Sequence, residues 1–120
     1  MAVSALSVEQ GEKAATALLS LTPRPTAVMC ANDLIALGML RGLTDAGVTV
    51  PGDIALVGYD DVAFASMLSP SLTSVRQPKY ELGAIAADLF LEEALGSGHR
   101  HRSVRFEPEL VVRASSGAPR

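Results

Sequence analysis

The sequence predicts an α/β fold, a partial Rossmann-like parallel sheet with flanking helices. Short apolar runs of strand length alternate with amphipathic stretches of helical length along most of the 120 residues. Apolar residues make up 48% of the chain and charged residues 19%, a balance that favours a folded core over intrinsic disorder. A chain of this length fits one small domain or part of a larger one.

The first predicted helix spans residues 7–21. Ser7 is a suitable N-cap, and Gln10 lies three residues later, as a capping box requires. Pro23 ends this helix, and residues 26–30 form a short apolar strand. The helix has one face of small and apolar residues, namely Gly11, Ala14, Ala15, Leu18 and Leu19.

The second predicted helix spans residues 34–46, with either Asn32 or Asp33 as its N-cap. Its inward stripe contains Gly38 and Gly42, each of which costs about 1 kcal/mol of helix propensity relative to Ala. These glycines predict that the helix lies very close to a sheet.

The remaining elements continue the alternation of strands and helices. Residues 54–59 are apolar almost throughout, as expected for a parallel strand that is buried on both faces. Gly47, before this strand, is a candidate for the C′ position of the preceding helix. We further expect a strand at 73–76, a helix at 81–95, a polar loop at 96–103, half-exposed strands at 104–107 and 110–113, and a frayed tail at 114–120.

Composition excludes several classes of protein. The net charge is −3, whereas a protein that binds nucleic acid directly needs a basic surface. No apolar run approaches the ~18 residues of a membrane span, and no signal peptide is apparent. Cys30 is the single cysteine, so no internal disulfide can form, and we expect a reducing, cytoplasmic location.

Polar side chains follow the predicted strands at their carboxyl ends, where open parallel sheets bind ligands. Asn32 and Asp33 follow one strand, Asp60 and Asp61 another, and Gln77 a third. We expect Asn32, Asp60 and Gln77 to reach one edge, where a carboxylate and two amides suit a small polar ligand. The alternative is that these residues cap helices and brace turns. A helix cap is preferred for Asp33, binding is preferred for Asp60, and both roles remain open for Asp61.

The sequence predicts no catalytic site, metal site or cofactor. His99 and His101 flank Arg100 in a polar loop that lacks Cys or carboxylate residues at metal-ligand spacing. Cys30 ends a buried strand without a basic neighbour, so we expect an inert thiol rather than a nucleophile. A small enzyme for phosphoryl transfer or hydrolysis is therefore the least favoured function, because no nucleophile–base pair is present.

Four ordered segments resemble the effector-binding module of LacI/GalR-family transcriptional repressors. They are PTAVMCANDLIALGMLRGL at 25–43, VPGDIALVGYDDV at 50–62, LTSVRQPKYELG at 72–83 and PELVVRAS at 108–115. The resemblance covers nearly the whole chain. It implies a type I periplasmic-binding-protein-like fold, in which two α/β subdomains hold a small ligand between them. It also implies that Asn32, Asp60 and Gln77 line the effector pocket.

The resemblance divides the chain between two subdomains. Residues 1–78 match part of the C-terminal subdomain, and residues 79–113 match a crossover helix and strands that belong in part to the other subdomain. The apolar face of the helix at 81–95 would then lack a partner within the chain. We expect this segment to dock on a second copy, with exchange between copies as one arrangement, or to be unusually mobile.

The family also dimerises through this subdomain, so the resemblance implies a homodimer. A second apolar side of the helix at 34–46, formed by Leu34 and Leu37 around Arg41, would be covered in that way. The alternative is a monomer in which the chain's own loop covers this side. The predicted dimer surface comprises Leu34, Leu37, Arg41, Phe64, Ser66, Met67 and Leu68.

The expected function is therefore that of a ligand-sensing and dimerisation fragment of a transcriptional regulator. A sugar or a nucleobase-like effector would control DNA binding allosterically, and DNA contact would belong to an N-terminal helix-turn-helix absent from this sequence. The alternative is a periplasmic-type module that binds a solute for an uptake system.

Overall fold

The computed structural model describes residues 2–96 and 101–117, which form two compact units. The first unit comprises Met1–Arg76 and Leu110–Arg120, and the second comprises Gln77–Glu109. The first unit is therefore assembled from two stretches that are separated in the sequence by the whole of the second.

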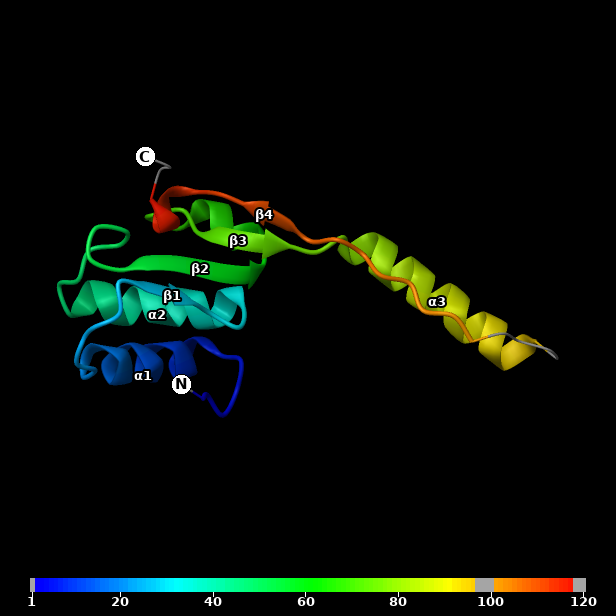
Figure 1. The fold of residues 1–120 in the computed structure, drawn as a ribbon, viewed down its shortest axis with the longest axis horizontal. Coiled ribbons are helices and arrows are strands. Elements are labelled where there is room, and N and C mark those ends of the chain that lie inside the picture. Colours follow the sequence, from blue (N-terminus) through cyan, green and yellow to red (C-terminus); the bar gives the residue numbers. More distant parts are fainter. Residues whose placement is uncertain (1, 97–100, 118–120) are drawn as a thin grey trace. The chain divides into compact units, whose positions relative to one another are not determined.

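A four-stranded sheet forms the centre of the first unit, in the order β1-β2-β3-β4 (Figure 1). β1 pairs in parallel with β2, and β2 pairs in parallel with β3. The chain thus has the predicted α/β fold with a mostly parallel sheet. Apart from the helix of the second unit, its elements are α1 (Val8–Leu19), β1 (Ala27–Met29), α2 (Asp33–Asp45), β2 (Ala55–Asp60), the 3-10 turn η1 (Ala63–Met67), β3 (Thr73–Arg76), β4 (Glu109–Val111) and the 3-10 turn η2 (Ala114–Ser116).

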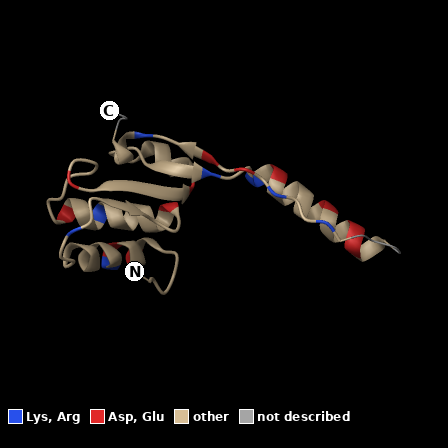
Figure 2. Cartoon of the chain, in the orientation of Figure 1, with Lys and Arg blue, Asp and Glu red and all other residues tan. Residues whose placement is uncertain are grey.

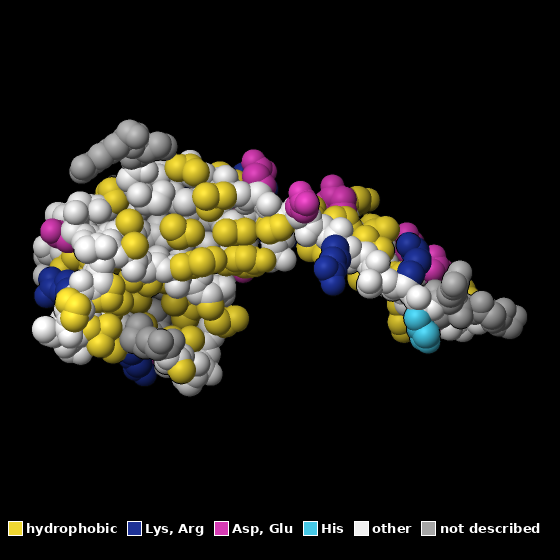
Figure 3. Space-filling model, in the orientation of Figure 1, with side chains coloured by type: hydrophobic (Ala, Val, Ile, Leu, Met, Phe, Trp, Pro, Cys, Tyr) yellow, Lys and Arg dark blue, Asp and Glu magenta, His cyan; other side chains and the backbone are white. Residues whose placement is uncertain are grey.

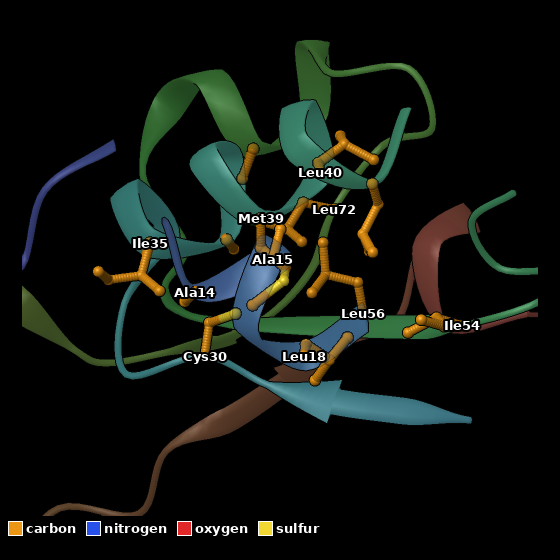
Figure 4. Packing of buried hydrophobic residues seen from close by; sticks show 13 residues of the cluster. Ala14, Ala15, Leu18, Cys30, Ile35, Met39, Leu40, Ile54, Leu56 and Leu72 are labelled. Carbon is orange, nitrogen blue, oxygen red and sulfur yellow. The ribbon is translucent and has the colours of Figure 1, made fainter. Parts of the chain in front are cut away.

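The core lies between the sheet and the two helices α1 and α2 (Figure 4). It is built from Leu18 of α1, Met39 of α2 and Leu56 of β2, all of them buried. Burial alternates along β2, so the prediction that this strand is buried on both faces is wrong. Val57 and Tyr59 face away from the core and are only half-buried, because α1 and α2 lie on the same side of the sheet.

The helices α1 and α2 approach one another backbone to backbone. A Cβ atom at Gly38 would overlap the carbonyl oxygen of Val8, and a Cβ atom at Gly11 would overlap that of Ile35. The glycines of α2 are therefore explained by close packing against α1, and not against the sheet as the sequence suggested.

Local capping follows the sequence closely. The hydroxyl of Ser7 accepts the backbone N–H of Gln10 at the start of α1. The side chain of Asn32 accepts the N–H of Ile35 at 3.0 Å and so caps α2. Gly47 follows α2 with φ = 72°, a backbone conformation that glycine adopts without the strain of a Cβ atom.

The C-terminal part of the first unit is more ordered than the sequence suggested. A frayed tail was expected from residue 114, but η2 places Ser115 in the interior. The hydroxyl of Ser115 donates to the carbonyl oxygen of Leu56 at 2.6 Å and accepts the N–H of Thr73 at 2.9 Å. These hydrogen bonds hold the segment against two strands of the sheet.

The second unit contains the helix α3 (Lys79–Leu95), which begins two residues earlier than predicted. No residue of α3 is buried, and Phe90 is 69% exposed. The strand expected at 104–107 is absent, and residues 101–108 have no regular secondary structure. Arg102 instead pairs with Glu92 of α3 at 2.9 Å.

Candidate functional site

The carboxyl ends of β1 and β2 lie at one edge of the sheet, because the two strands are parallel neighbours. Asp60 is the last residue of β2, and Asn32 stands three residues beyond the end of β1. Gln77 directly follows Arg76, the last residue of β3, and is the first residue of the second unit. Asn32 and Asp60 thus share the first unit, whereas Gln77 opens the second.

Asn32 is half-buried at the start of α2, and its amide oxygen is occupied by the cap. A side-chain amide has a separate pair of N–H donors on its nitrogen. Recognition of a ligand by Asn32 would therefore depend on those donors, while the oxygen fixes the orientation of the side chain.

Asp60 has an unusual backbone conformation for a residue that carries a Cβ atom. Its φ is 104°, and that of the next residue, Asp61, is 48°. Such conformations cost about 1–3 kcal/mol each, persist only when the surroundings enforce them, and are concentrated at functional sites. This is the strongest local indication that the end of β2 has a role beyond the fold.

Asp33 braces this turn. The sequence favoured Asp33 as a helix cap, but the cap of α2 is Asn32. The residue is 1% exposed, and one carboxylate oxygen accepts the hydroxyl of Ser74 at 2.7 Å. The other oxygen accepts the backbone N–H of Val62 at 2.9 Å. Sequence reasoning missed Ser74. The one available signal was Gly58, which pairs with Ser74 in the register of β2 and β3 and leaves room for the Asp33 carboxylate to approach the strand.

Asp61 braces the edge of the sheet through ion pairs. Its carboxylate contacts Arg113 at 2.6 Å and Arg76 at 2.7 Å. Hydrogen bonding from Arg113 and then from Arg76 lowers the pKa of the Asp61 carboxyl below its ordinary value, against the opposing effect of burial. Of the two roles left open for Asp61, the structure supports bracing.

The structure describes two of the three candidate metal-binding or nucleophilic residues, Cys30 and His101. Burial, with a smaller effect from Asp33, raises the pKa of the Cys30 thiol to about 12, so the thiolate is scarce at neutral pH. His101 contacts Glu93 at 3.3 Å, and His99 lies outside the described residues. Over residues 2–96 and 101–117, no group of three His, Cys, Asp or Glu side chains could hold a metal ion.

The predicted dimer surface is exposed in part. Met67 is 79% exposed and Leu34 is also exposed, while Arg41 pairs with Glu12 of α1 at 3.3 Å. Ser66 is exposed as well. The half-buried members of this surface are Leu37, Phe64 and Leu68.

The surface of the described residues is mixed in character. Lys and Arg are interspersed with Asp and Glu along the ribbon, in keeping with the net charge of −3 (Figure 2). Hydrophobic side chains gather over the sheet of the first unit (Figure 3), and Met29, Leu110 and Val112 are among the exposed ones. No helix among these residues has the length and apolarity needed to cross a bilayer.

Comparison with known sequences identifies relatives over almost the entire chain. The family model for the periplasmic binding protein-like domain matches residues 2–116. The chain is 38% identical over 107 residues to the HTH-type transcriptional repressor PurR of Photobacterium profundum. The aligned region covers 89% of this chain and 32% of that protein. It is 37% identical, with the same two coverages, to the ribose operon repressor of Haemophilus influenzae. The chain thus spans about a third of the length of these curated relatives.

Solved structures show the same relationship. A putative LacI-family regulator of Sanguibacter keddieii is 36% identical with a TM-score of 0.86, over 97% of this chain and 43% of that one. A LacI-family regulator of Enterococcus faecium with bound ribose is 30% identical with a TM-score of 0.83, over 95% and 42%. These relatives are transcriptional repressors or transcriptional regulators, one of them a putative one. The chain therefore belongs to the periplasmic binding protein-like domain family and corresponds to part of the effector-binding domain of LacI-family transcriptional regulators.

Proposed function

We propose that this chain is the effector-sensing part of a LacI-family transcriptional regulator that acts in the cytoplasm. Its ligand is a small polar molecule, a sugar or a nucleobase-like compound. Ligand binding changes the arrangement of the two subdomains, and this change alters the hold of a separate helix-turn-helix segment on DNA. The chain itself makes no contact with DNA in this proposal, in agreement with its negative net charge.

The observation that carries this proposal is the position and backbone conformation of Asp60. The residue ends β2 with φ = 104°, at the same sheet edge as Asn32. A carboxylate there accepts hydrogen bonds from hydroxyl groups or ring N–H groups, and the Asn32 amide donates them. We assign Gln77, which follows β3, as the third ligand-binding residue. The ribose bound to the relative from Enterococcus faecium carries hydroxyl groups of the kind that this set recognises.

Isothermal titration calorimetry with ribose, sucrose, adenine and guanine tests the assignment. The variant Asp60→Asn removes the charge and tolerates a positive φ, so the turn is retained. A hydrogen bond to a charged group contributes about 1.5–3 kcal/mol, so we expect binding to weaken roughly tenfold or more. Asp45→Asn, the same substitution at the exposed last residue of α2, serves as the matched control and should bind as the wild type does. The assignment fails if none of the four compounds binds, or if Asp60→Asn binds as tightly as Asp45→Asn.

We also propose that the chain forms a homodimer through the surface around Leu34 and Met67. Both side chains are exposed, and burial of such apolar area is favourable. Met67→Asp would place a charge in the interface and shift the molecule to a monomer in analytical ultracentrifugation. Leu21→Asp, at an exposed leucine outside this surface, should leave the distribution unchanged. Equal sedimentation of the wild type and Met67→Asp would disprove the interface.

A second copy, with segment exchange as one form of contact, is proposed to cover α3 as well. The support is that no residue of α3 is buried although Tyr80, Phe90 and Leu95 are large apolar side chains. Phe90→Asp is expected to weaken association in the same sedimentation experiment. A monodisperse 12.5 kDa species whose α3 amides resist hydrogen exchange would contradict this assignment.

A further inference from the structure

We infer that Asp33 and Ser74 form a buried clamp that positions the Asp60 carboxylate for effector binding. Neither residue was assigned to the ligand, and both side chains are buried beneath the turn that follows β2. The inference rests on the function proposed above, because it makes these two residues positioning residues for the ligand-binding Asp60.

The clamp holds the two peptide groups that immediately follow Asp60. The hydroxyl of Ser74 accepts the N–H of Asp61 at 3.0 Å and donates to the Asp33 carboxylate at 2.7 Å. The second oxygen of that carboxylate accepts the N–H of Val62 at 2.9 Å. Two consecutive N–H groups of the turn therefore donate to one pair of side chains, Ser74 and Asp33, which are hydrogen-bonded to each other.

This arrangement explains why Asp60 can keep its uncommon backbone conformation. A residue with a Cβ atom leaves the φ > 0 region unless its neighbours are fixed. The clamp fixes the peptide groups on the C-terminal side of Asp60, and the ladder of β2 fixes the strand before it. These contacts fix the backbone on both sides of Asp60, from which its side chain projects.

The clamp also ties Asp60 to Asn32, another predicted ligand-binding residue. Asp33 is the first residue of α2, and its neighbour Asn32 is the cap of that helix. A connection thus runs from Asn32 through Asp33 and Ser74 to the turn at Asp60, and it fixes the separation of the two recognition groups. Preorganisation of this kind lowers the cost of binding, since the ligand does not have to order the site.

A glycine provides the space for the clamp. A Cβ atom at Gly58 would overlap the Asp33 carboxylate and lie 3.0 Å from Cδ2 of Leu72. Gly58 stands beside Ser74 in the register of β2 and β3. The carboxylate therefore lies directly on the strand backbone, where any larger residue would displace it.

The test separates positioning from simple stabilisation by comparing two buried serines. Ser74→Ala removes the clamp hydroxyl, whereas Ser115→Ala removes a hydroxyl that is also fully buried and also makes two hydrogen bonds, but to Leu56 and Thr73. Both variants should lower the midpoint of urea unfolding. Only Ser74→Ala should weaken binding of the ribose, sucrose, adenine or guanine that the wild type binds, by about tenfold.

Asp33→Ala provides a second variant in case Ser74→Ala does not fold. It removes both carboxylate oxygens, so neither the N–H of Val62 nor the Ser74 hydroxyl keeps its acceptor, and we expect a similar loss of affinity. If Ser74→Ala and Asp33→Ala bind as tightly as Ser115→Ala, while Asp60→Asn binds more weakly, the clamp has no positioning role and the inference is overturned.

Hydrogen exchange measured by NMR without ligand distinguishes this failure from failure of the proposed function. The clamp predicts that the amides of Asp61 and Val62 are protected in the wild type. Asp61 should lose protection in Ser74→Ala, and Val62 should lose it in Asp33→Ala. Fast exchange of both amides in the wild type refutes the clamp itself. Protected amides together with no binding of the four compounds by the wild type refute the proposed function instead, and with it the role in effector binding.

Discussion

Replacing Gly38 by Ala is expected to destabilise the protein, although Ala is the better helix former. Gly38 lies in the interior of α2, where Ala is favoured over Gly by about 1 kcal/mol. The added Cβ atom would overlap the carbonyl oxygen of Val8 and lie 2.9 Å from the backbone nitrogen of Glu12. Both neighbouring atoms belong to the backbone of α1, so no side-chain rotation relieves the overlap.

The helices would have to separate at their crossing, and this separation determines the magnitude. Overpacking of a tight interior costs about 1–3 kcal/mol and occasionally more. Here the cost lies at the upper end, because moving α1 also loosens the contacts of Ala15 and Leu18 in the core. After the gain in propensity is subtracted, we expect a net loss of about 2 kcal/mol, a substantial part of the ~5–15 kcal/mol that is typical of a domain.

Urea unfolding followed by far-UV circular dichroism measures this loss. Gly83→Ala in α3 is the matched control, because nothing lies within 4 Å of a Cβ atom built at that glycine. The control should keep the midpoint of the wild type and show equal or higher helicity. An unfolding midpoint for Gly38→Ala at or above that of the wild type would refute the backbone-to-backbone packing of α1 and α2.

Three further outcomes follow from hydrogen bonds, charge and burial. The pKa of Asp61 is lower in the folded state than its unfolded value of about 3.9, so its carboxylate stabilises the fold above that pH and the contribution is lost as the pH falls through the folded pKa. The difference in unfolding free energy between the wild type and Asp61→Asn should therefore be largest near neutral pH and shrink in acid, and a pH-independent difference would contradict the ion pairs. Ser115→Ala should cost about 2–3 kcal/mol in urea unfolding, because the Thr73 N–H is left without its partner in the interior; a loss below roughly 0.5 kcal/mol would show that the segment is not held there. Cys30, with its pKa raised to about 12, should react with a maleimide at mildly alkaline pH far more slowly in the native protein than in urea, and equal rates would contradict its burial.

Local chemistry made much of the fold predictable from the sequence. The hydroxyl of Ser7 and the glycine at position 47 act at helix ends through contacts within a few residues, so the sequence reveals them directly. The bounds of the strand at 73–76 agree with the structure, and the alternation of strands and helices indicated the α/β class. These features share a short range along the chain.

The bracing of the candidate site was not predictable in the same way. Ser74 lies 41 residues from Asp33, and Arg113 lies 52 residues from Asp61, so periodicity and capping rules carry no information about these pairs. Asn32 and Asp33 are adjacent and both suit an N-cap, so local rules could not decide which one the helix uses. The predicted strand at 104–107 failed for a related reason, because alternation alone does not provide a neighbouring strand to pair with.

The position of Ser115 bears on how the polypeptide matures as it is synthesised. Its hydroxyl satisfies the carbonyl of Leu56 and the N–H of Thr73, yet it is made after all of Gln77–Glu109. A nascent chain that stops before Leu110 exposes these two strand groups to water or to any partner that can pair with them. The final locking of β2 and β3 must therefore wait until Ser115 has been synthesised, and until then the two strand groups are open to wrong pairing.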